Sequence, residues 1–449
     1  MEPRFRSKSF FLLSLLGVVL VLAHPNRIDR VMAAGLSGFP QITQAGDVAA
    51  SAACPGDPVG QIFPSGNPWN TAISGLPVHS NSANLVASIG TGGSLHPDFG
   101  TVYEGAPWGI PFIVVDGSQP YLPVNYTAYG SQSDPGPYPI PLNAPIEGGS
   151  SSPGDRHVLA FNSSNRFLYE MFYSFPQVSI WNAASGAIFD TMTNFQRPLD
   201  WTSADAAGLS ILAGLARYEE VQCGAINHAL RFTAVTTRQA YIYPASHQAG
   251  SSTSPNVPAM GQRFRLKSSV NISSFSPQAK IILQALKTYG MIVADNGGNW
   301  FLSGAPNPNW DDADIDHLKQ IHGSDFEAVD TSTLQPPTDT VSPVGPSNLI
   351  LSVASSAQIN VAWTAATDGV GVLGCRILVS VNSNFSNPLP AYSRAYVGNS
   401  LNASLNQLNP STKYYVKVLA YDEAGNVSNG TTGNVTTASS KRVRQLVSD

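Results

Sequence analysis

The segment from Gln335 to Asn348 constrains the fold most, because it cannot belong to a hydrophobic core. It reads QPPTDTVSPVGPSN. Its prolines fix φ and its polar residues bury no apolar surface, so we expect an exposed, semi-rigid linker. The chain must therefore build one core before this segment and another after it. We predict a linker over 335–345, a larger domain over 54–334 and a smaller domain over 346–437.

Apolar and polar residues alternate along the segment that follows the linker. Ile359, Val361 and Trp363 share one face of an expected strand, and the run from Tyr414 to Asp422 has the same alternation. Period two is typical of half-buried strands. About 90 residues of such strands suit one β-sandwich.

Motifs in this segment carry a resemblance to the fibronectin type III family. They are Val361-Ala362-Trp363, Leu408 to Tyr414, Ala420-Tyr421-Asp422 and Gly425-Asn426. The Trp of the early strand and the Tyr at the later strand corner are the most specific parts. The resemblance covers roughly Pro346 to Thr437 and implies a seven-strand sandwich. In secreted bacterial enzymes such a module is usually a spacer or accessory domain, so the resemblance implies no chemistry.

The first 34 residues have the organisation of a secretory signal peptide. Arg4, Arg6 and Lys8 precede an apolar run from Phe10 to Ala23, which ends in small residues. A charged start, a short apolar core and a small-residue exit indicate export. The alternative is a membrane anchor, but a span needs about 20 apolar residues. We therefore expect a secreted protein, extracellular or periplasmic, without stable membrane insertion.

Composition limits the classes of molecule that the protein can bind, and the cysteine positions indicate which thiols can form a disulfide. A net charge of −5 and 12% charged residues give no basic footprint for nucleic acid. A weakly charged polysaccharide or cell-surface glycan fits better.

Of the three cysteines, Cys54 and Cys223 fall in one predicted domain and are the favoured disulfide pair, with Cys375 left over. The alternative is three buried thiols.

The larger domain is predicted to be mainly β. With 39 Gly and 34 Pro in the chain, short strands and many turns are favoured over long helices. Helices are expected from Ser276 to Tyr289, with Ser276 as the cap, and from Asp312 to Ile321. We therefore predict a jelly-roll or β-sandwich-like domain with one or two helices packed against it. The expected strands are Ile110 to Val115, His157 to Phe161, Phe167 to Tyr173, Ala229 to Thr233 and Gln239 to Tyr243.

The larger domain also resembles a family of secreted bacterial proteins of unassigned activity. The motifs that carry this resemblance are His96 to Gly100, Trp201 to Gly208, His228 to Phe232 and Ala294 to Gly297. The resemblance brings no mechanism with it. The chain also lacks GxSxG, HExxH, P-loop and GxGxxG signatures, so candidate sites rest on residue chemistry alone.

A first candidate set is His157 and Glu170. Glu170 lies inside an apolar strand, where a lone buried carboxylate is costly, so it must be solvated, paired or ligated. His157, Glu170 and His247 could hold a divalent metal, because imidazole and carboxylate suit transition ions. The structural alternative is that Glu170 points outward or pairs with Arg166.

A second candidate set is catalytic and brings His228, Tyr241 and His247 together. His228 shares strand parity with apolar neighbours, whereas Arg231 points to the opposite face and is the weakest member. His, Tyr and Arg can abstract a proton beside a carboxylate and neutralise the developing charge, as in a polysaccharide lyase. The alternative is that His228 is a hydrogen-bonded core residue.

A third candidate set would bind substrate through aromatic rings and carboxylates. Its members are Trp201, Asp205, Tyr243, Asp295 and Trp300. Sugar rings stack on aromatic faces while carboxylates bind their hydroxyls, although Asp and Asn also cap turns. The sequence thus favours a secreted carbohydrate-active enzyme, a glycosidase or a lyase. The alternative is a non-catalytic glycan-binding or structural protein.

Overall fold

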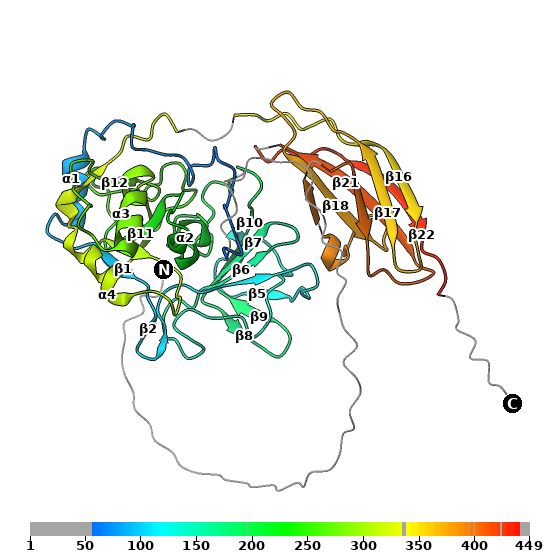
Figure 1. The fold of residues 1–449 in the computed structure, drawn as a ribbon, viewed down its shortest axis with the longest axis horizontal. Coiled ribbons are helices and arrows are strands. Elements are labelled where there is room, and N and C mark those ends of the chain that lie inside the picture. The colour runs from blue at the N-terminus through cyan, green and yellow to red at the C-terminus, as the bar shows by residue number, and fades with distance from the viewer. Residues whose placement is uncertain are drawn as a thin grey trace, which may run out of the picture. The chain divides into compact units, whose positions relative to one another are not determined.

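The computed structural model describes residues 56–440 apart from 195, 335–337, 394, 399 and 423. The predicted signal peptide and Cys54 lie outside these residues. The mainly β prediction is confirmed, since several sheets and few helices make up the described chain (Figure 1). Within the described residues, no helix is long and apolar enough to cross a membrane.

The largest sheet has six strands in the order β1-β14-β11-β13-β12-β15. Its strands are β1 (His96–Asp98), β11 (Leu230–Ala234), β12 (Arg263–Leu266), β13 (Met291–Asn296), β14 (Phe301–Ser303) and β15 (Phe326–Ala328). The sheet is mixed, because β1 pairs with β14 and β11 pairs with β13 in parallel. The helix α3 (Pro277–Thr288) packs against β12 and buries Ile282, Leu283 and Leu286 in the same core (Figure 1).

A second sheet has four strands in the order β10-β7-β6-β4. These are β4 (Phe112–Val115), β6 (Val158–Asn162), β7 (Phe167–Phe172) and β10 (Ser185–Asp190). Leu159 and Phe161 of β6 join the same core as Phe232 of β11, so the two sheets share one hydrophobic interior. Because β4 and β6 run parallel, this sheet is also mixed. A jelly roll is antiparallel, so a β-sandwich-like description fits the larger part better.

Smaller elements complete the larger part. They are the hairpin β2 (Val102–Tyr103) and β3 (Ala106–Pro107), the three-stranded sheet β5 (Val124–Tyr126), β9 (Trp181–Ala183) and β8 (Phe175–Pro176), and the helices α1 (Ser82–Ile89), α2 (Tyr218–Gln222) and α4 (Asp312–Ile315). The predicted helix from Asp312 to Ile321 is divided between α4 and a 3-10 helix at Asp316–Gln320. The predicted strand from Gln239 to Tyr243 is wrong, because this segment makes only an isolated bridge at Tyr241.

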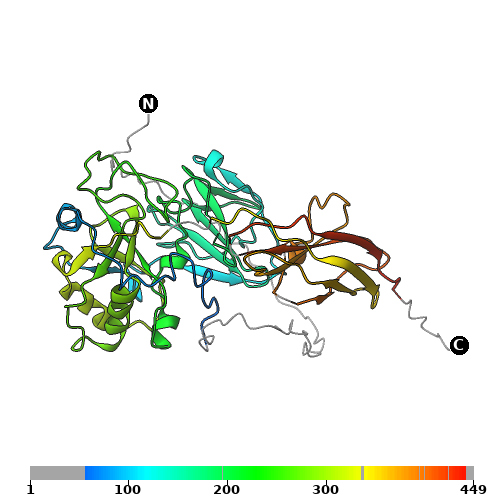
Figure 2. The same ribbon diagram turned by 90° about the horizontal axis from the view of Figure 1, so that it is seen from above.

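The residues after the linker form a fibronectin type III sandwich of seven strands. One sheet is β16 (Ser347–Val353), β17 (Ile359–Thr364) and β20 (Asn402–Leu405); the other is β19 (Ala395–Gly398), β18 (Gly374–Ser380), β21 (Lys413–Tyr421) and β22 (Thr431–Thr436). Figure 2 shows the gold and the orange-to-red strands of this sandwich as two layers. Trp363 is buried between them, and the hydroxyl of Tyr414 accepts a hydrogen bond from the Asn409 amide at 2.8 Å. This is the tyrosine corner of such folds.

The cysteines follow the favoured pairing as far as the structure describes them. Cys223 is disulfide-bonded, whereas Cys375 is a free thiol buried in the sandwich. The alternative of three thiols is therefore wrong. Cys54, the expected partner of Cys223, lies outside the described residues.

Candidate functional site

The side chain of Arg231 lies at the centre of a buried group of charges. Its Nε and Nη2 donate to the two carboxylate oxygens of Asp205 at 3.1 and 3.2 Å. Its Nη1 donates to the Ser303 hydroxyl at 2.7 Å, and Nη2 lies 3.6 Å from a carboxylate oxygen of Asp295. A forked guanidinium thus holds two carboxylates, one from a loop and one from β13, in a single site.

His157 and Glu147 form a second ion pair in the same region. His157 Nδ1 lies 2.6 Å from Glu147 Oε2, and its Nε2 lies 3.0 Å from the main-chain oxygen of Ala204. Because Ala204 precedes Asp205 in the chain, this contact brings the His157 pair to the Arg231 site. The charge of His157 also acts on the pKa values of Asp205 and Asp295.

Glu170 of β7 adds a further carboxylate, which is fully buried. Its oxygens accept hydrogen bonds from the Ser210 hydroxyl at 2.9 Å and from the amides of Ile211 and Leu212 at 2.9 and 3.0 Å. These donors explain how the protein tolerates a carboxylate inside an apolar strand. We call the six residues the Arg231 cluster: Glu147, His157, Glu170, Asp205, Arg231 and Asp295.

The environment moves the pKa values of the cluster in different directions. Burial and the neighbouring charge of Asp205 raise the pKa of Asp295 to about 7, although Arg231 and His157 oppose this. Burial also raises the pKa of Glu170 and of Asp205. Burial alone would raise the pKa of Glu147, but the charge and hydrogen bonds of His157 outweigh it and lower that pKa. Strongly perturbed titratable groups with specific charge partners are typical of functional sites.

Two carboxylates of the cluster are accessible from solvent. The side chains of Glu147 and Asp295 are 26% and 23% exposed, whereas those of His157, Asp205 and Arg231 are at most 4% exposed. Glu147 and Asp295 are therefore the members of the cluster that solvent reaches, and their ion-pair partners His157 and Arg231 are buried.

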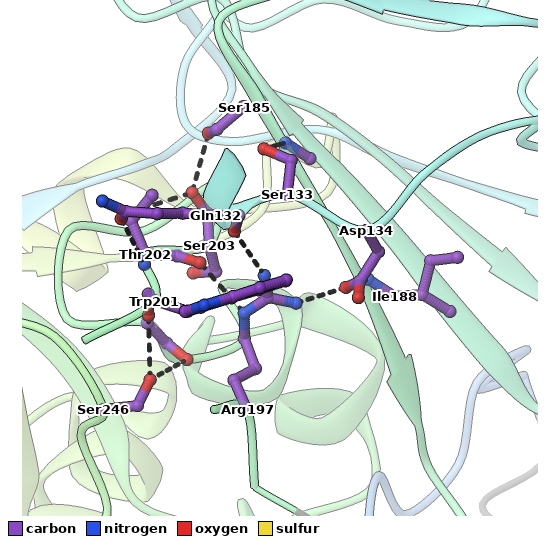
Figure 3. A network of polar contacts seen from close by, with 12 residues as sticks. Gln132, Ser133, Asp134, Ser185, Ile188, Arg197, Trp201, Thr202, Ser203 and Ser246 are labelled. Atoms are coloured by element: carbon purple, nitrogen blue, oxygen red, sulfur yellow. Dashed lines mark hydrogen bonds and ion pairs between the residues drawn. The ribbon is translucent and has the colours of Figure 1, made fainter. Parts of the chain in front are cut away.

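The loop that carries Asp205 is fixed by a polar network (Figure 3). Arg197 donates to the main-chain oxygens of Thr202 and Gln132 at 3.0 and 2.9 Å, and it pairs with Asp134. The Arg197 guanidinium lies 5.8 Å from the centre of the Trp201 ring, beside it in Figure 3. The loop is therefore rigid at its start, and Trp201 remains half-buried at the surface.

His228 belongs to a different ion network from the Arg231 cluster. Its Nε2 lies 3.1 Å from both carboxylate oxygens of Glu220, and its Nδ1 lies 2.7 Å from the Ala229 oxygen. Glu220 also pairs with Arg217, which pairs with Asp57. Both ring nitrogens of His228 thus have partners in a buried network. This geometry matches the alternative in which His228 is a hydrogen-bonded core residue.

The remaining predicted residues are not gathered into one cleft with His228. The Tyr241 hydroxyl donates to Asp200 at 3.0 Å, and His247 Nδ1 lies 2.8 Å from the Ala206 oxygen. Tyr243 lines a cavity of about 40 Å³, far smaller than a ligand pocket. Trp300 is fully buried between Phe232 and Phe326. Stacking on a sugar is therefore not available to Trp300, and the expectation for this residue is wrong.

The predicted metal set of His157, Glu170 and His247 does not converge. His157 and Glu170 have their donor atoms engaged by protein groups, as described above, and His247 contacts the Asp205 loop instead. Among the described residues, one group has carboxylate or imidazole atoms close enough for an ion. It joins Asp339 of the predicted linker to Asp368 and Asp422 of the fibronectin module.

An aromatic group lies on the same face of the six-stranded sheet as the cluster. Asp295 pairs with Thr233, Thr233 with Phe301, and Phe301 with His96 in adjacent strands. Paired residues share a face, and three strand spacings separate Asp295 from His96 by roughly 14 Å.

The row continues beyond the edge of the sheet. His96 stacks on Phe301 with ring centres 4.1 Å apart, and the Trp108 ring lies 6.3 Å from that of His96. Tyr103, on the β2–β3 hairpin, lies 5.7 Å from Trp108 and is 59% exposed. The Trp108 indole donates to Asp98 at 3.2 Å. We call Tyr103, Trp108, His96 and Phe301 the aromatic row.

The sequence reasoning missed Glu147, Ser303 and the aromatic row. Glu147 stands in a Gly- and Pro-rich loop, where a carboxylate carries no pattern of its own. Tyr103 and Trp108 stand on either side of the turn at Gly105. Two aromatic residues flanking a hairpin turn are a sequence signal that could have identified them.

Comparisons with known proteins concern only a small part of the chain. No family model matches it. A curated relative, chitinase A1 of Niallia circulans, is 34% identical over 98 residues, which are 22% of this chain and 12% of the chitinase. The chain therefore spans a small fraction of that relative's length.

Solved structures with similar segments include fibronectin type III domains. The domain of human collagen XX is 30% identical, with 23% of this chain and 98% of that chain covered and a TM-score of 0.18. The chitinase ChiA74 of Bacillus thuringiensis is 22% identical, with 30% of this chain and 18% of that chain covered and a TM-score of 0.19. These similarities leave the chemistry of the Arg231 cluster to be argued from its own geometry.

Proposed function

We propose that the protein is an extracellular carbohydrate-active enzyme that hydrolyses a polysaccharide at the Arg231 cluster. The observation that carries the proposal is a pair of accessible carboxylates in one site with opposite pKa shifts. The pKa of Asp295 is raised to about 7, and that of Glu147 is lowered. Pairs of carboxyl groups whose environments separate their pKa values divide into a proton donor and an ionised partner.

Each member of the cluster has a role in this mechanism. Protonated Asp295 donates its proton to the leaving glycosidic oxygen as that bond breaks. Glu147 stays ionised beside His157, stabilises the positive charge on the sugar and accepts a proton from the attacking water, whose oxygen forms the new bond; that proton then returns to Asp295 through solvent. Asp205 and Arg231 are positioning residues. The charge of Asp205 raises the pKa of Asp295, and Arg231 holds the carboxylates of Asp205 and Asp295 in place.

The aromatic row and Trp201 supply the binding surface in this proposal. Aromatic faces accept the apolar faces of pyranose rings, and Asp98 can accept bonds from hydroxyls. The row lies on the same sheet face as Asp295, so a polymer bound along it would reach the acid. Because the curated relative is a chitinase, chitin and its oligosaccharides are the first substrates to test.

The test measures reducing-end release from a polysaccharide panel at pH 5 to 9. Asp295→Asn and Glu147→Gln should each lose about 10²-fold or more of the activity, the usual scale for an acid or base. Activity should fall as pH rises through about 7, because Asp295 must carry its proton. Asp116→Asn, at an exposed residue whose carboxylate accepts hydrogen bonds from Ser118, is the matched control and should be unchanged. Full activity of Asp295→Asn would overturn the assignment.

A non-catalytic glycan-binding role is the second candidate, and it is favoured by the aromatic row, which is exposed at Tyr103 and half-buried at its other members. In that case the protein is retained on an insoluble glycan, no product appears, and Tyr103→Ala with Trp108→Ala abolishes retention. Product release by the unmodified protein would exclude this reading.

A further inference from the structure

Three acidic residues from distant segments meet at one end of the fibronectin sandwich. Asp339 comes from the segment before β16, Asp368 from the turn between β17 and β18, and Asp422 from the end of β21. One carboxylate oxygen from each lies within 4.8 Å of the other two. We call these residues the Asp339 site.

Their negative charges have no cationic partner in the described part of the chain. None of the ion pairs found there includes any of the three. Asp422 is fully buried, and among the described residues its carboxylate oxygens accept the amide and the side-chain N–H of Asn426, at 3.0 and 2.9 Å. A buried carboxylate beside two others is costly unless a positive charge compensates it.

One oxygen of the site is buried and has no hydrogen-bond donor. Asp339 Oδ1 accepts the Val341 amide at 3.0 Å, but Oδ2 has no partner although less than 1 Å² of its surface is exposed. The Asn426 side chain holds this segment in place by donating to the Asp339 main-chain oxygen at 3.1 Å. An unpaired buried acceptor lowers the stability of the folded state, so a ligand for Oδ2 is expected.

We propose that the Asp339 site binds a hard divalent cation, Ca²⁺ in particular. Ca²⁺ prefers oxygen ligands at about 2.3–2.6 Å, so two ligands of one ion lie at most about 5 Å apart. The three carboxylate oxygens meet this limit, and water completes the shell. The ion joins the segment before β16 to two loops of the sandwich, so it fixes where the linker enters the module. This inference is independent of the proposed hydrolysis.

The experiment uses the full chain, stripped with a chelator and titrated with CaCl₂, with MgCl₂ as the comparison. Calorimetry should show one Ca²⁺ bound per chain, with weaker binding of Mg²⁺. Saturating Ca²⁺ should raise the Tm of the fibronectin transition by about 5 °C or more, as a ligand that binds only the folded state does.

Asp368→Asn gives a result that misfolding cannot imitate. The amide oxygen of Asn can still accept the Val370 and Gly371 N–H groups that Asp368 accepts at 2.9 and 3.2 Å. Without Ca²⁺ this variant should melt higher than the unmodified chain, because one of three repelling charges is gone. With Ca²⁺ it should show no further rise.

Matched measurements decide the proposal. Asp316→Asn removes a charge outside the site and should keep the full Ca²⁺ response. Absence of stoichiometric Ca²⁺ binding by the unmodified chain would overturn the proposal, as would an unchanged Ca²⁺ response in Asp368→Asn. Equal binding of Mg²⁺ would reject Ca²⁺ as the preferred ion.

Discussion

At the scale of residues, the ion pair of His157 and Glu147 makes the Arg231 cluster contribute to the folding stability of the larger part. Burial alone would lower the pKa of His157, but the Glu147 charge outweighs it and raises this pKa to about 9. The unfolded chain has the ordinary value of 6.5. The stability that the charged His157 contributes is therefore complete below pH 6.5 and is lost as pH rises through 9.

Thermal unfolding at several pH values tests this coupling. The difference between the two pKa values corresponds to a contribution on the order of 3 kcal/mol. We expect the Tm of the larger part to fall between pH 6.5 and 9.5, and His157→Gln to lower the Tm at pH 6 and flatten that fall. His317→Gln, at an exposed imidazole, should keep the full pH dependence. An equally steep fall in His157→Gln would disprove the coupling.

At this scale the sequence indicated which side chains need polar partners, but it did not indicate which residues supply them. Strict alternation placed Arg231 opposite His228 in one strand, but His228 lies before β11 begins at Leu230 and contacts Glu220, while the charged cluster surrounds Arg231. A carboxylate inside the Phe167 to Tyr173 run required a partner, and Glu170 has three donors. Those donors belong to a loop 40 residues away, which no local pattern indicates.

At the scale of elements, the helix α3 is capped by a residue outside it. Ser276 occupies the N-cap position as predicted, but its hydroxyl donates to Asp314 and accepts no helix amide. The Asp314 carboxylate accepts the amides of Gln278 and Ala279 at 3.1 and 2.9 Å. A negative charge at a helix N-terminus also interacts favourably with its dipole.

This arrangement predicts unequal effects of two substitutions. Asp314→Ala should lower the free energy of unfolding by about 1–2 kcal/mol, because two amides at the start of α3 lose their acceptor. Ser276→Ala should cost less, since the carboxylate keeps both amides. Chemical denaturation of the two variants measures this. A larger loss for Ser276→Ala would restore the hydroxyl as the cap.

Element prediction succeeded where the pattern was local. The periodicity of α3, the apolar run of β7 and the alternation in β11 and β21 are properties of single segments, and these elements exist within one or two residues of the expected ends. The Gln239 to Tyr243 segment also alternates and donates backbone hydrogen bonds to Ser252 and Met260, yet it forms an isolated bridge at Tyr241 and no continuous ladder. Alternation yields a strand only where a neighbouring segment pairs with it over several successive residues, and the sequence does not show that pairing.

At the scale of the whole molecule, the chain has separate hydrophobic cores on the two sides of the Pro-rich segment. The buried cores of the larger part use residues up to Ala328, and the core of the sandwich begins at Ile359. The boundaries at 334 and 346 remain a proposal that follows from this separation. Units with their own cores can fold alone.

Insertion of a protease site between residues 334 and 338 tests whether the units are independent. After cleavage, both pieces should unfold cooperatively, because each hydrophobic core consists of residues from its own side of the cut. The larger piece should keep the activity of the uncut chain on soluble oligosaccharides within about twofold, since the Arg231 cluster lies wholly before residue 334. The smaller piece, which retains Asp339, should keep its Ca²⁺-dependent rise in Tm. Loss of cooperative unfolding in the larger piece would place the boundary elsewhere, because the sandwich would then be part of its fold.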